Sequence, residues 1–227
     1  MSPSGALSPS VFSVQHKEIR AVLWDFGGVI LSSPFEAFNR YEAANGLPTD
    51  LIRRVNSTNP HDNAWALLER SDITPAEFDT MFAAESETLG HRVPGADVLA
   101  LLSGDVRPAM VAALDKVIAE GYVTACLTNN VVSTEPPKDE RSAQVRAIMD
   151  KFHAVVESSK VGCRKPEPRF YEIACELISV SPDECVFLDD LGINLKPAAA
   201  MGMRTVKVGD PQVALDELSG HLGISFG

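Results

Sequence analysis

Apolar, β-branched stretches recur along the chain and are separated by longer segments in which apolar residues follow helical spacing. These stretches are Ile19–Trp24, Tyr122–Leu127, Phe152–Val156, Cys185–Leu188 and Arg204–Val208. Short buried strands that alternate with helical crossovers are typical of a parallel sheet covered by helices on both faces. The pattern therefore predicts an α/β fold with a Rossmann-like parallel sheet core.

The region between the first two predicted strands is too long to be an ordinary crossover. It shows no strand pattern from residue 33 to residue 103. We therefore predict a helical cap, inserted over residues 33–103, and an α/β core made of residues 18–32 and 104–227. Residues 1–17 lack a long apolar run and predict a disordered tail.

Three sites carry the capping-box pattern of a hydroxyl residue, a proline and then a glutamate two residues further on. They are Ser33-Pro-Phe-Glu36, Thr74-Pro-Ala-Glu77 and Ser181-Pro-Asp-Glu184. Each is predicted to begin a helix or helical turn, with the hydroxyl as the N-cap. We assign these residues no chemistry.

Composition limits the kinds of partner. The chain has 20 Lys and Arg against 31 Asp and Glu, a net charge of −11. It contains no basic run of the kind that follows a phosphate backbone, so nucleic acid is not expected as a partner. No apolar run approaches the length of a membrane span, and the N-terminus does not resemble a signal peptide. We expect a cytoplasmic protein whose four cysteines, none in a C-x-x-C motif, are buried free thiols.

Polar and charged residues follow four of the predicted strands. They are Asp25 after the first, Thr128-Asn129-Asn130 after the second, Lys165 in the loop after the third, and Asp189-Asp190 after the fourth. The carboxyl ends of parallel strands meet at one edge of the sheet, which is where ligands bind such folds. We therefore expect these side chains to converge on one site.

The residue types at this edge indicate a phosphate-handling metal site. Carboxylates that share a desolvated cleft oppose each other's ionisation, and a divalent cation relieves that repulsion. Oxygen ligands suit Mg²⁺, which shares phosphate oxygens with its substrate. Thr128 and Lys165 would contact the other phosphate oxygens. Asp25 would attack phosphorus and form an aspartyl-phosphate that water hydrolyses, and Gly27 and Gly28 would let the backbone turn tightly beside the ligand.

From about Ile19 onward the sequence resembles the haloacid dehalogenase-like hydrolase superfamily. The family's four motifs are matched in order by Asp25-Phe-Gly-Gly-Val29, Leu127-Thr-Asn-Asn130, Lys165-Pro166 and Asp189-Asp190. The insert resembles the cap of that family. "DFGGV", "LTNN" and "RKPEP" together resemble the subgroup similar to the phosphatase-like N-terminal domain of soluble epoxide hydrolase.

The resemblance implies a role for each matched position. Asp25 would be the nucleophile and a Mg²⁺ ligand, and Thr128 and Lys165 would hold the phosphoryl group. Phe26 and Asn129 would complete the phosphate site. Metal ligands would come from the Gly27 carbonyl, Asp189 and Asp190, with Asp190 the more direct of the pair because it starts a D-x-x-x-N stretch.

The chain departs from the family pattern at Gly27. Most phosphatases of the family carry an aspartate there, two residues after the nucleophile, as general acid and base. Such help contributes roughly 10²- to 10⁴-fold to a rate. Its loss favours substrates with good leaving groups, such as a sugar 1-phosphate or an acyl phosphate. Water or a cap residue could substitute, with Glu36, His61 and Asp62 as candidates.

Three functions therefore remain open. The first is a Mg²⁺-dependent phosphatase that acts on a small phosphorylated metabolite. The second is a metal-independent 2-haloacid dehalogenase, a branch that also lacks the second aspartate, although the Asp189-Asp190 pair is better explained by a metal site. The third is a catalytically impaired domain that binds phosphate or regulates without turnover, as Gly27 suggests.

Overall fold

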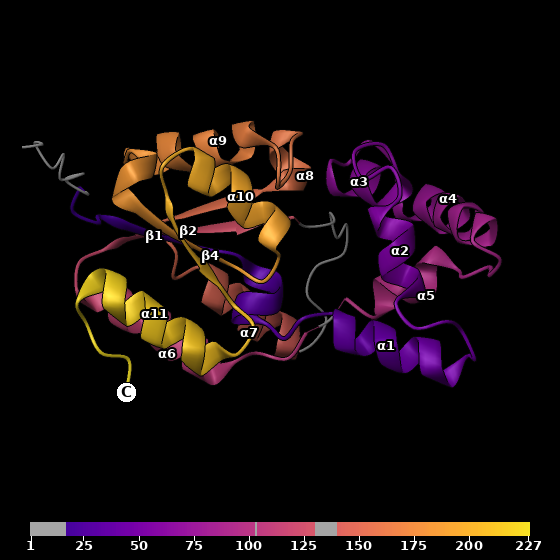
Figure 1. Cartoon of the computed structure of the whole chain (residues 1–227), viewed down its shortest axis with the longest axis horizontal. Helices are drawn as coiled ribbons and strands as arrows, with labels where there is room; N and C mark the ends of the chain where they lie inside the picture. The colour runs from indigo at the N-terminus through magenta and orange to yellow at the C-terminus, as the bar shows by residue number, and fades with distance from the viewer. Residues whose placement is uncertain (1–16, 103, 130–139) are drawn as a thin grey trace, which may run out of the picture.

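The computed structural model describes residues 17–102, 104–129 and 140–227, and its core is a five-stranded parallel sheet in the order β3-β2-β1-β4-β5 (Figure 1). The strands are β1 (Ala21–Trp24), β2 (Val123–Thr128), β3 (Ala154–Glu157), β4 (Cys185–Asp189) and β5 (Arg204–Lys207). The α/β prediction is confirmed, and each predicted strand is present with its ends moved by two residues or fewer. The predicted tail lies almost wholly outside the described residues, as does Asn130.

The central strand of the sheet is apolar because both faces of the sheet are covered, whereas the edge strand β5 (Arg-Thr-Val-Lys) is only partly buried. In β1, Ala21, Val22, Leu23 and Trp24 are all fully buried. Successive side chains of a strand point to opposite faces. Accordingly, Val22 and Trp24 pack with α6, α7 and α11, whereas Ala21 and Leu23 pack with α9 and α10.

Helices form one layer on each side of the sheet (Figure 1). One layer consists of α6 (Pro108–Ala119), α7 (Glu140–Met149) and α11 (Pro211–Leu222), and the other of α9 (Pro168–Ile178) and α10 (Gly192–Ala200). The short helix α8 (Ser158–Val161) follows β3, and a helical turn over Pro182–Glu184 precedes β4.

The segment between β1 and β2 folds into a separate group of helices beside the sheet (Figure 1). These helices are α1 (Phe35–Ala44), α2 (Leu51–Ser57), α3 (Ala64–Glu69), α4 (Pro75–Thr88) and α5 (Gly95–Ala100). Their apolar faces form a core of their own, which includes the fully buried Phe78 and Phe82. We refer to these helices as the cap.

A helix or helical turn begins within two residues of each of the three predicted N-caps. Thr74 and Glu77 form a complete capping box at the start of α4. At Ser181 the Glu184 carboxylate accepts the backbone N–H of Ser181 at 3.1 Å. At Ser33 the helix α1 follows as predicted, but the N-cap role of the hydroxyl was wrong, because the residue before α1 is Pro34 and no side chain caps the helix.

Chain entry into and exit from the cap occur side by side. Leu31 and Val106 form an antiparallel bridge, and the Ser32 N–H donates to the Asp105 carbonyl at 2.7 Å. In return the Asp105 N–H donates to Ser32 Oγ at 2.9 Å. A Cβ on Gly104 would collide with the Ser32 carbonyl, so a glycine is required at this crossing. We refer to Leu31–Ser32 and residues 104–106 as the neck.

The predicted state of the cysteines is confirmed, since all four are free and buried. No helix among the described residues is both long enough and apolar enough to cross a membrane.

Candidate active site at the carboxyl ends of the strands

The predicted nucleophile, Asp25, is buried at the end of the central strand. Its N–H continues the ladder to Leu188 by donating to that carbonyl at 2.8 Å. Its Oδ1 accepts two hydrogen bonds, from the Phe26 N–H at 2.6 Å and from Lys165 Nζ at 2.7 Å. Oδ2 has no partner within the described part of the chain. One carboxylate oxygen is thus fixed, while the other is available.

The two glycines after Asp25 differ in what surrounds them. Gly28 has φ +80°, and a Cβ there would overlap the Asp190 carboxylate, so only glycine fits. Gly27 has φ −73°, is exposed and has no atom within 4 Å of a Cβ built on it. The turn therefore needs Gly28, whereas position 27 has room for a side chain.

Lys165 is the cation of the site and lies between two carboxylates. Its Nζ is 2.7 Å from Asp25 Oδ1 and 2.8 Å from Asp189 Oδ2, and its side chain is only 1% exposed. Burial by itself lowers the pKa of Lys165, but the two carboxylates outweigh burial and hold the pKa above its usual value. Lys165 therefore remains protonated. Its peptide bond to Pro166 is cis.

Asp189 is fully buried at the end of β4, and protein donors surround it. Besides Lys165, the Leu191 N–H donates to its Oδ1 at 2.8 Å, and Asn194 Nδ2 lies 3.0 and 3.1 Å from its two oxygens. Both oxygens of Asp189 are therefore engaged in holding neighbouring groups in place.

Asp190 has fewer partners. Ser33 Oγ, from just before the cap, donates to its Oδ2 at 3.2 Å. The Ser33 hydroxyl thus contacts the site, and no side chain caps α1. Burial, together with the nearby charge of Asp189, raises the pKa of Asp190 to about 6.

The three carboxylates form one compact group. One oxygen each from Asp25, Asp189 and Asp190 lies within 4.8 Å of the others. Burial also raises the pKa of Asp25 well above its ordinary value, despite the opposing effect of Lys165. Lys165 by itself therefore does not balance the negative charge of these three carboxylates, and the donor set suits a divalent cation that prefers oxygen ligands.

Of the two residues predicted at the end of β2, Asn129 contacts Lys165. Thr128, the last residue of β2, is buried. The Asn129 side chain pairs with the backbone of Lys165, because its Nδ2 donates to the Lys165 carbonyl at 3.0 Å and its Oδ1 accepts the Lys165 N–H at 2.9 Å. Asn129 thus ties the end of β2 to the lysine loop.

Phe26 contributes little of its side chain to the site. The ring is 4% exposed and belongs to the core cluster under α6 and α11. Its N–H points at Asp25 Oδ1. Any contact with a ligand would have to come from the main chain.

The cap also contributes polar residues near the site, and sequence reasoning missed one of them. Glu69, the last residue of α3, is buried against Arg164 and Asn129. Its only signal in the sequence is a charge at the end of an apolar helix. The candidate acids His61 and Asp62 are exposed in the loop before α3, and the side chain of Glu36 is outside the described set.

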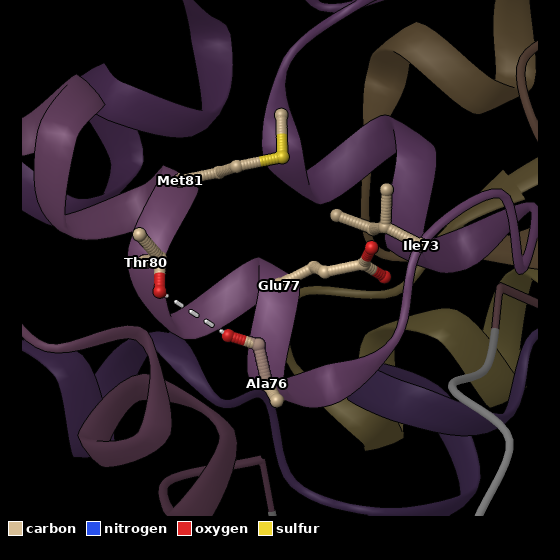
Figure 2. A pocket seen from close by; sticks show the side chains of 5 residues that line it. All are labelled: Ile73, Ala76, Glu77, Thr80 and Met81. Atoms are coloured by element: carbon tan, nitrogen blue, oxygen red, sulfur yellow. Dashed lines mark hydrogen bonds between the residues drawn. The ribbon is translucent and has the colours of Figure 1, made fainter.

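A shallow hollow of about 370 Å³ lies on the cap, away from these residues (Figure 2). Its lining comes from the first half of α4 and from Ile73, two residues before that helix: Ile73, Ala76, Glu77, Thr80 and Met81. Glu77 is already used in the capping box with Thr74. None of the lining residues belongs to the predicted site.

Comparisons with known proteins support the family resemblance and the fold. A family model for haloacid dehalogenase-like hydrolases matches residues 19–202. Acyl-CoA dehydrogenase family member 10 of Mus musculus is 34% identical over 216 residues, which cover 91% of this chain and 19% of that protein. Bifunctional epoxide hydrolase 2 of Mus musculus is 30% identical over 219 residues, 92% of this chain and 40% of that protein. The chain therefore spans less than half the length of these relatives.

Two further proteins match over most of their own length. Phosphatase MT3486 of Mycobacterium tuberculosis is 30% identical over 202 residues, 84% of this chain and 87% of that protein. A HAD family enzyme from Bacteroides thetaiotaomicron, solved with magnesium and inorganic phosphate, has the same fold, with a TM-score of 0.56 at 24% identity over 85% of this chain and 96% of the other. The chain belongs to the haloacid dehalogenase-like hydrolase family.

Proposed function

We propose that this protein is a Mg²⁺-dependent phosphatase that hydrolyses a small phosphorylated metabolite through an aspartyl-phosphate on Asp25. The observation that carries the proposal is the grouping of Asp25, Lys165, Asp189 and Asp190 at one edge of the sheet. The similarity to Phosphatase MT3486 over nearly its whole length supports the same reaction class.

Asp25, Asp190 and the Gly27 carbonyl are the groups that we expect to hold Mg²⁺. Asp190 is the better candidate of the aspartate pair, because both oxygens of Asp189 already accept protein hydrogen bonds. Burial and then the nearby charge of Asp189 raise the pKa of Asp190, and a bound cation would favour the charged form of this carboxyl. When bound, Mg²⁺ supplies positive charge for the phosphoryl oxygens.

In the first step, Asp25 Oδ2 attacks phosphorus while the bond from phosphorus to the leaving oxygen breaks. Lys165 holds Asp25 through Oδ1, so Oδ2 faces the substrate. The Thr128 hydroxyl, the Lys165 ammonium and the Asn129 main chain contact the phosphoryl oxygens. The Asn129 side chain is excluded from that contact because its amide is bound to Lys165.

In the second step, water attacks the phosphorus of the aspartyl-phosphate, and the bond to Asp25 breaks. Inorganic phosphate leaves and the carboxylate is restored. The leaving oxygen of the first step takes its proton from water or from a cap residue, because Gly27 has no acid to offer. Sugar 1-phosphates and acyl phosphates, which need least protonation, are the expected substrate classes.

The test is release of phosphate from p-nitrophenyl phosphate, with Mg²⁺ or with EDTA, by the wild type and by Asp25→Asn. We expect metal-dependent turnover that Asp25→Asn reduces by several orders of magnitude, since the amide cannot act as the nucleophile. Asp216→Asn is a matched control, because Asp216 is an exposed residue of α11 whose carboxylate contacts Gln212.

Other outcomes point to the other functions. Undiminished turnover in Asp25→Asn would exclude this nucleophile. Halide release from 2-chloropropionate in EDTA would indicate a dehalogenase. Binding of inorganic phosphate by the wild type without turnover of any aryl phosphate would indicate a binding domain.

A further inference from the structure

Glu69 is a buried carboxylate at the boundary between the cap and the core. Its side chain is 6% exposed, and its Oε2 lies 2.6 Å from a terminal nitrogen of Arg164. Asn129 Nδ2 approaches the same oxygen at 3.4 Å, and the Trp65 side chain also hydrogen-bonds to Glu69. A carboxylate of the cap therefore contacts two residues of the core, both next to the candidate phosphate site.

Arg164 is directed from the core toward the cap. It directly precedes Lys165, and its side chain is 14% exposed. One terminal nitrogen binds Glu69, and the other donates to the Pro60 carbonyl in the loop before α3 at 3.2 Å. Both ends of the guanidinium thus contact the cap. Figure 1 shows α3 facing α8 across this boundary.

These contacts continue to the nucleophile. Glu69 touches Asn129, the Asn129 amide holds the backbone of Lys165 on both sides, and Lys165 Nζ holds Asp25. The cap is joined to the core covalently at the neck and, through these ionic contacts, beside Lys165. The position of the cap and the conformation of the loop that carries Lys165 are therefore linked through these contacts.

We propose that Glu69 is a positioning residue whose ion pair with Arg164 clasps the cap over the phosphate site. Its effect on turnover rests on the proposed phosphatase function. With the clasp closed, the site is in its binding-competent form. Breaking the pair lowers the fraction of molecules in that form, which raises the apparent KM by the same factor. The kcat changes less, because Asn129 keeps both of its hydrogen bonds to Lys165.

The test is a double-mutant cycle of Glu69→Gln, Arg164→Gln and the double variant, assayed with p-nitrophenyl phosphate. We expect KM to rise about tenfold in each single variant, and the double variant to match the singles because the two residues act as one unit. Singles whose KM effects multiply in the double variant, or a KM that does not change, would overturn the proposal.

Glu85→Gln is the matched control. Glu85 is another carboxylate of the cap, and its Oε1 accepts the Ala64 N–H at the start of the same helix at 2.8 Å. We expect any loss of stability of α3 to appear in this variant without a rise in KM. An equal rise in KM would mean that the effect of Glu69 is general weakening of the helix.

Trp65 supplies a readout that does not depend on turnover. Trp24→Phe leaves Trp65 as the sole tryptophan, and the Trp24 indole nitrogen has no hydrogen-bond partner within the described part of the chain. In this background we expect acrylamide to quench Trp65 more strongly when Glu69→Gln is added. Unchanged quenching would overturn the clasp even if the wild type proves to have no phosphatase activity.

Discussion

Two residues apart, Asp25 and Gly27 have opposite surroundings, and this contrast defines the chemistry open to the site. Asp25 is buried and held by Lys165, whereas position 27 is exposed, has an ordinary φ and faces empty space. The absence of an acid at position 27 is therefore not enforced by crowding. A carboxylate would fit there without moving the turn.

We predict that Gly27→Asp raises kcat for phenyl phosphate by about 10²-fold, since an acid at this point can protonate a poor leaving group. The gain for p-nitrophenyl phosphate should be much smaller, because that leaving group needs little protonation. A plot of kcat against leaving-group pKa for both proteins is the measurement. Gly27→Asn is the control, and an equal gain from the amide would refute the acid role.

The sequence predicted which residues at the strand ends come together, but it did not predict contacts between the cap region and the core. Asp25, Lys165 and Asp189 converge as the strand-end argument requires. The partnership of Ser33 with Asp190 joins residues 157 positions apart. No local pattern encodes such a pair, because it depends on where the cap meets the sheet.

At the scale of elements, the sequence predicts where a helix or strand begins and ends when residues close by in the chain set those ends. β1 is a continuous apolar run and β4 is one that ends in Asp189, and both are buried along their whole length, so their bounds follow from composition. In the capping boxes at Thr74 and Ser181, the hydrogen-bonding partners all lie within four consecutive residues. At Ser33 a helix follows but the hydroxyl is not its cap, and the contact that the hydroxyl makes with Asp190 is a tertiary one that no local pattern encodes.

Thr74→Ala should lower the free energy of unfolding by about 1 kcal/mol, because it removes the hydroxyl that accepts the Glu77 N–H at 3.2 Å. Urea unfolding followed by circular dichroism measures the change. Thr80→Ala is the matched control, since Thr80 is exposed within the same helix and Oγ1 contacts the Ala76 carbonyl only at 3.4 Å (Figure 2). A similar loss in both variants would argue against the cap.

At the scale of the whole molecule, metal-free stability should depend on the carboxylate group. Burial raises the pKa of Asp25 and Asp190, the latter to about 6 from an ordinary value of 3.8. Between those two values Asp190 binds more protons in the folded protein than in the unfolded chain, so its contribution to stability falls as pH rises, and that loss is complete above about pH 6. The burial of these carboxylates, together with their mutual repulsion, therefore opposes folding at neutral pH.

We predict that, in EDTA, the wild type loses more Tm between pH 5 and pH 7 than Asp190→Asn does. Mg²⁺ at pH 7 should raise the Tm of the wild type, because a ligand of the folded state stabilises it, and should do so far less in the variant. Differential scanning calorimetry gives these values. If the Tm of the wild type instead rises with pH relative to that of the variant, the predicted direction of the pH effect on stability is wrong.

The neck has a consequence for how such a protein can diversify. The chain leaves the sheet and returns to it at neighbouring residues, joined by the bond from the Ser32 N–H to the Asp105 carbonyl at 2.7 Å. Everything between these points can lengthen, shorten or be exchanged without changing the pairing of β1 with β2. The parallel sheet and its carboxylates can therefore be inherited intact while the inserted helices are replaced, and one reactive centre can be offered to a succession of different molecules.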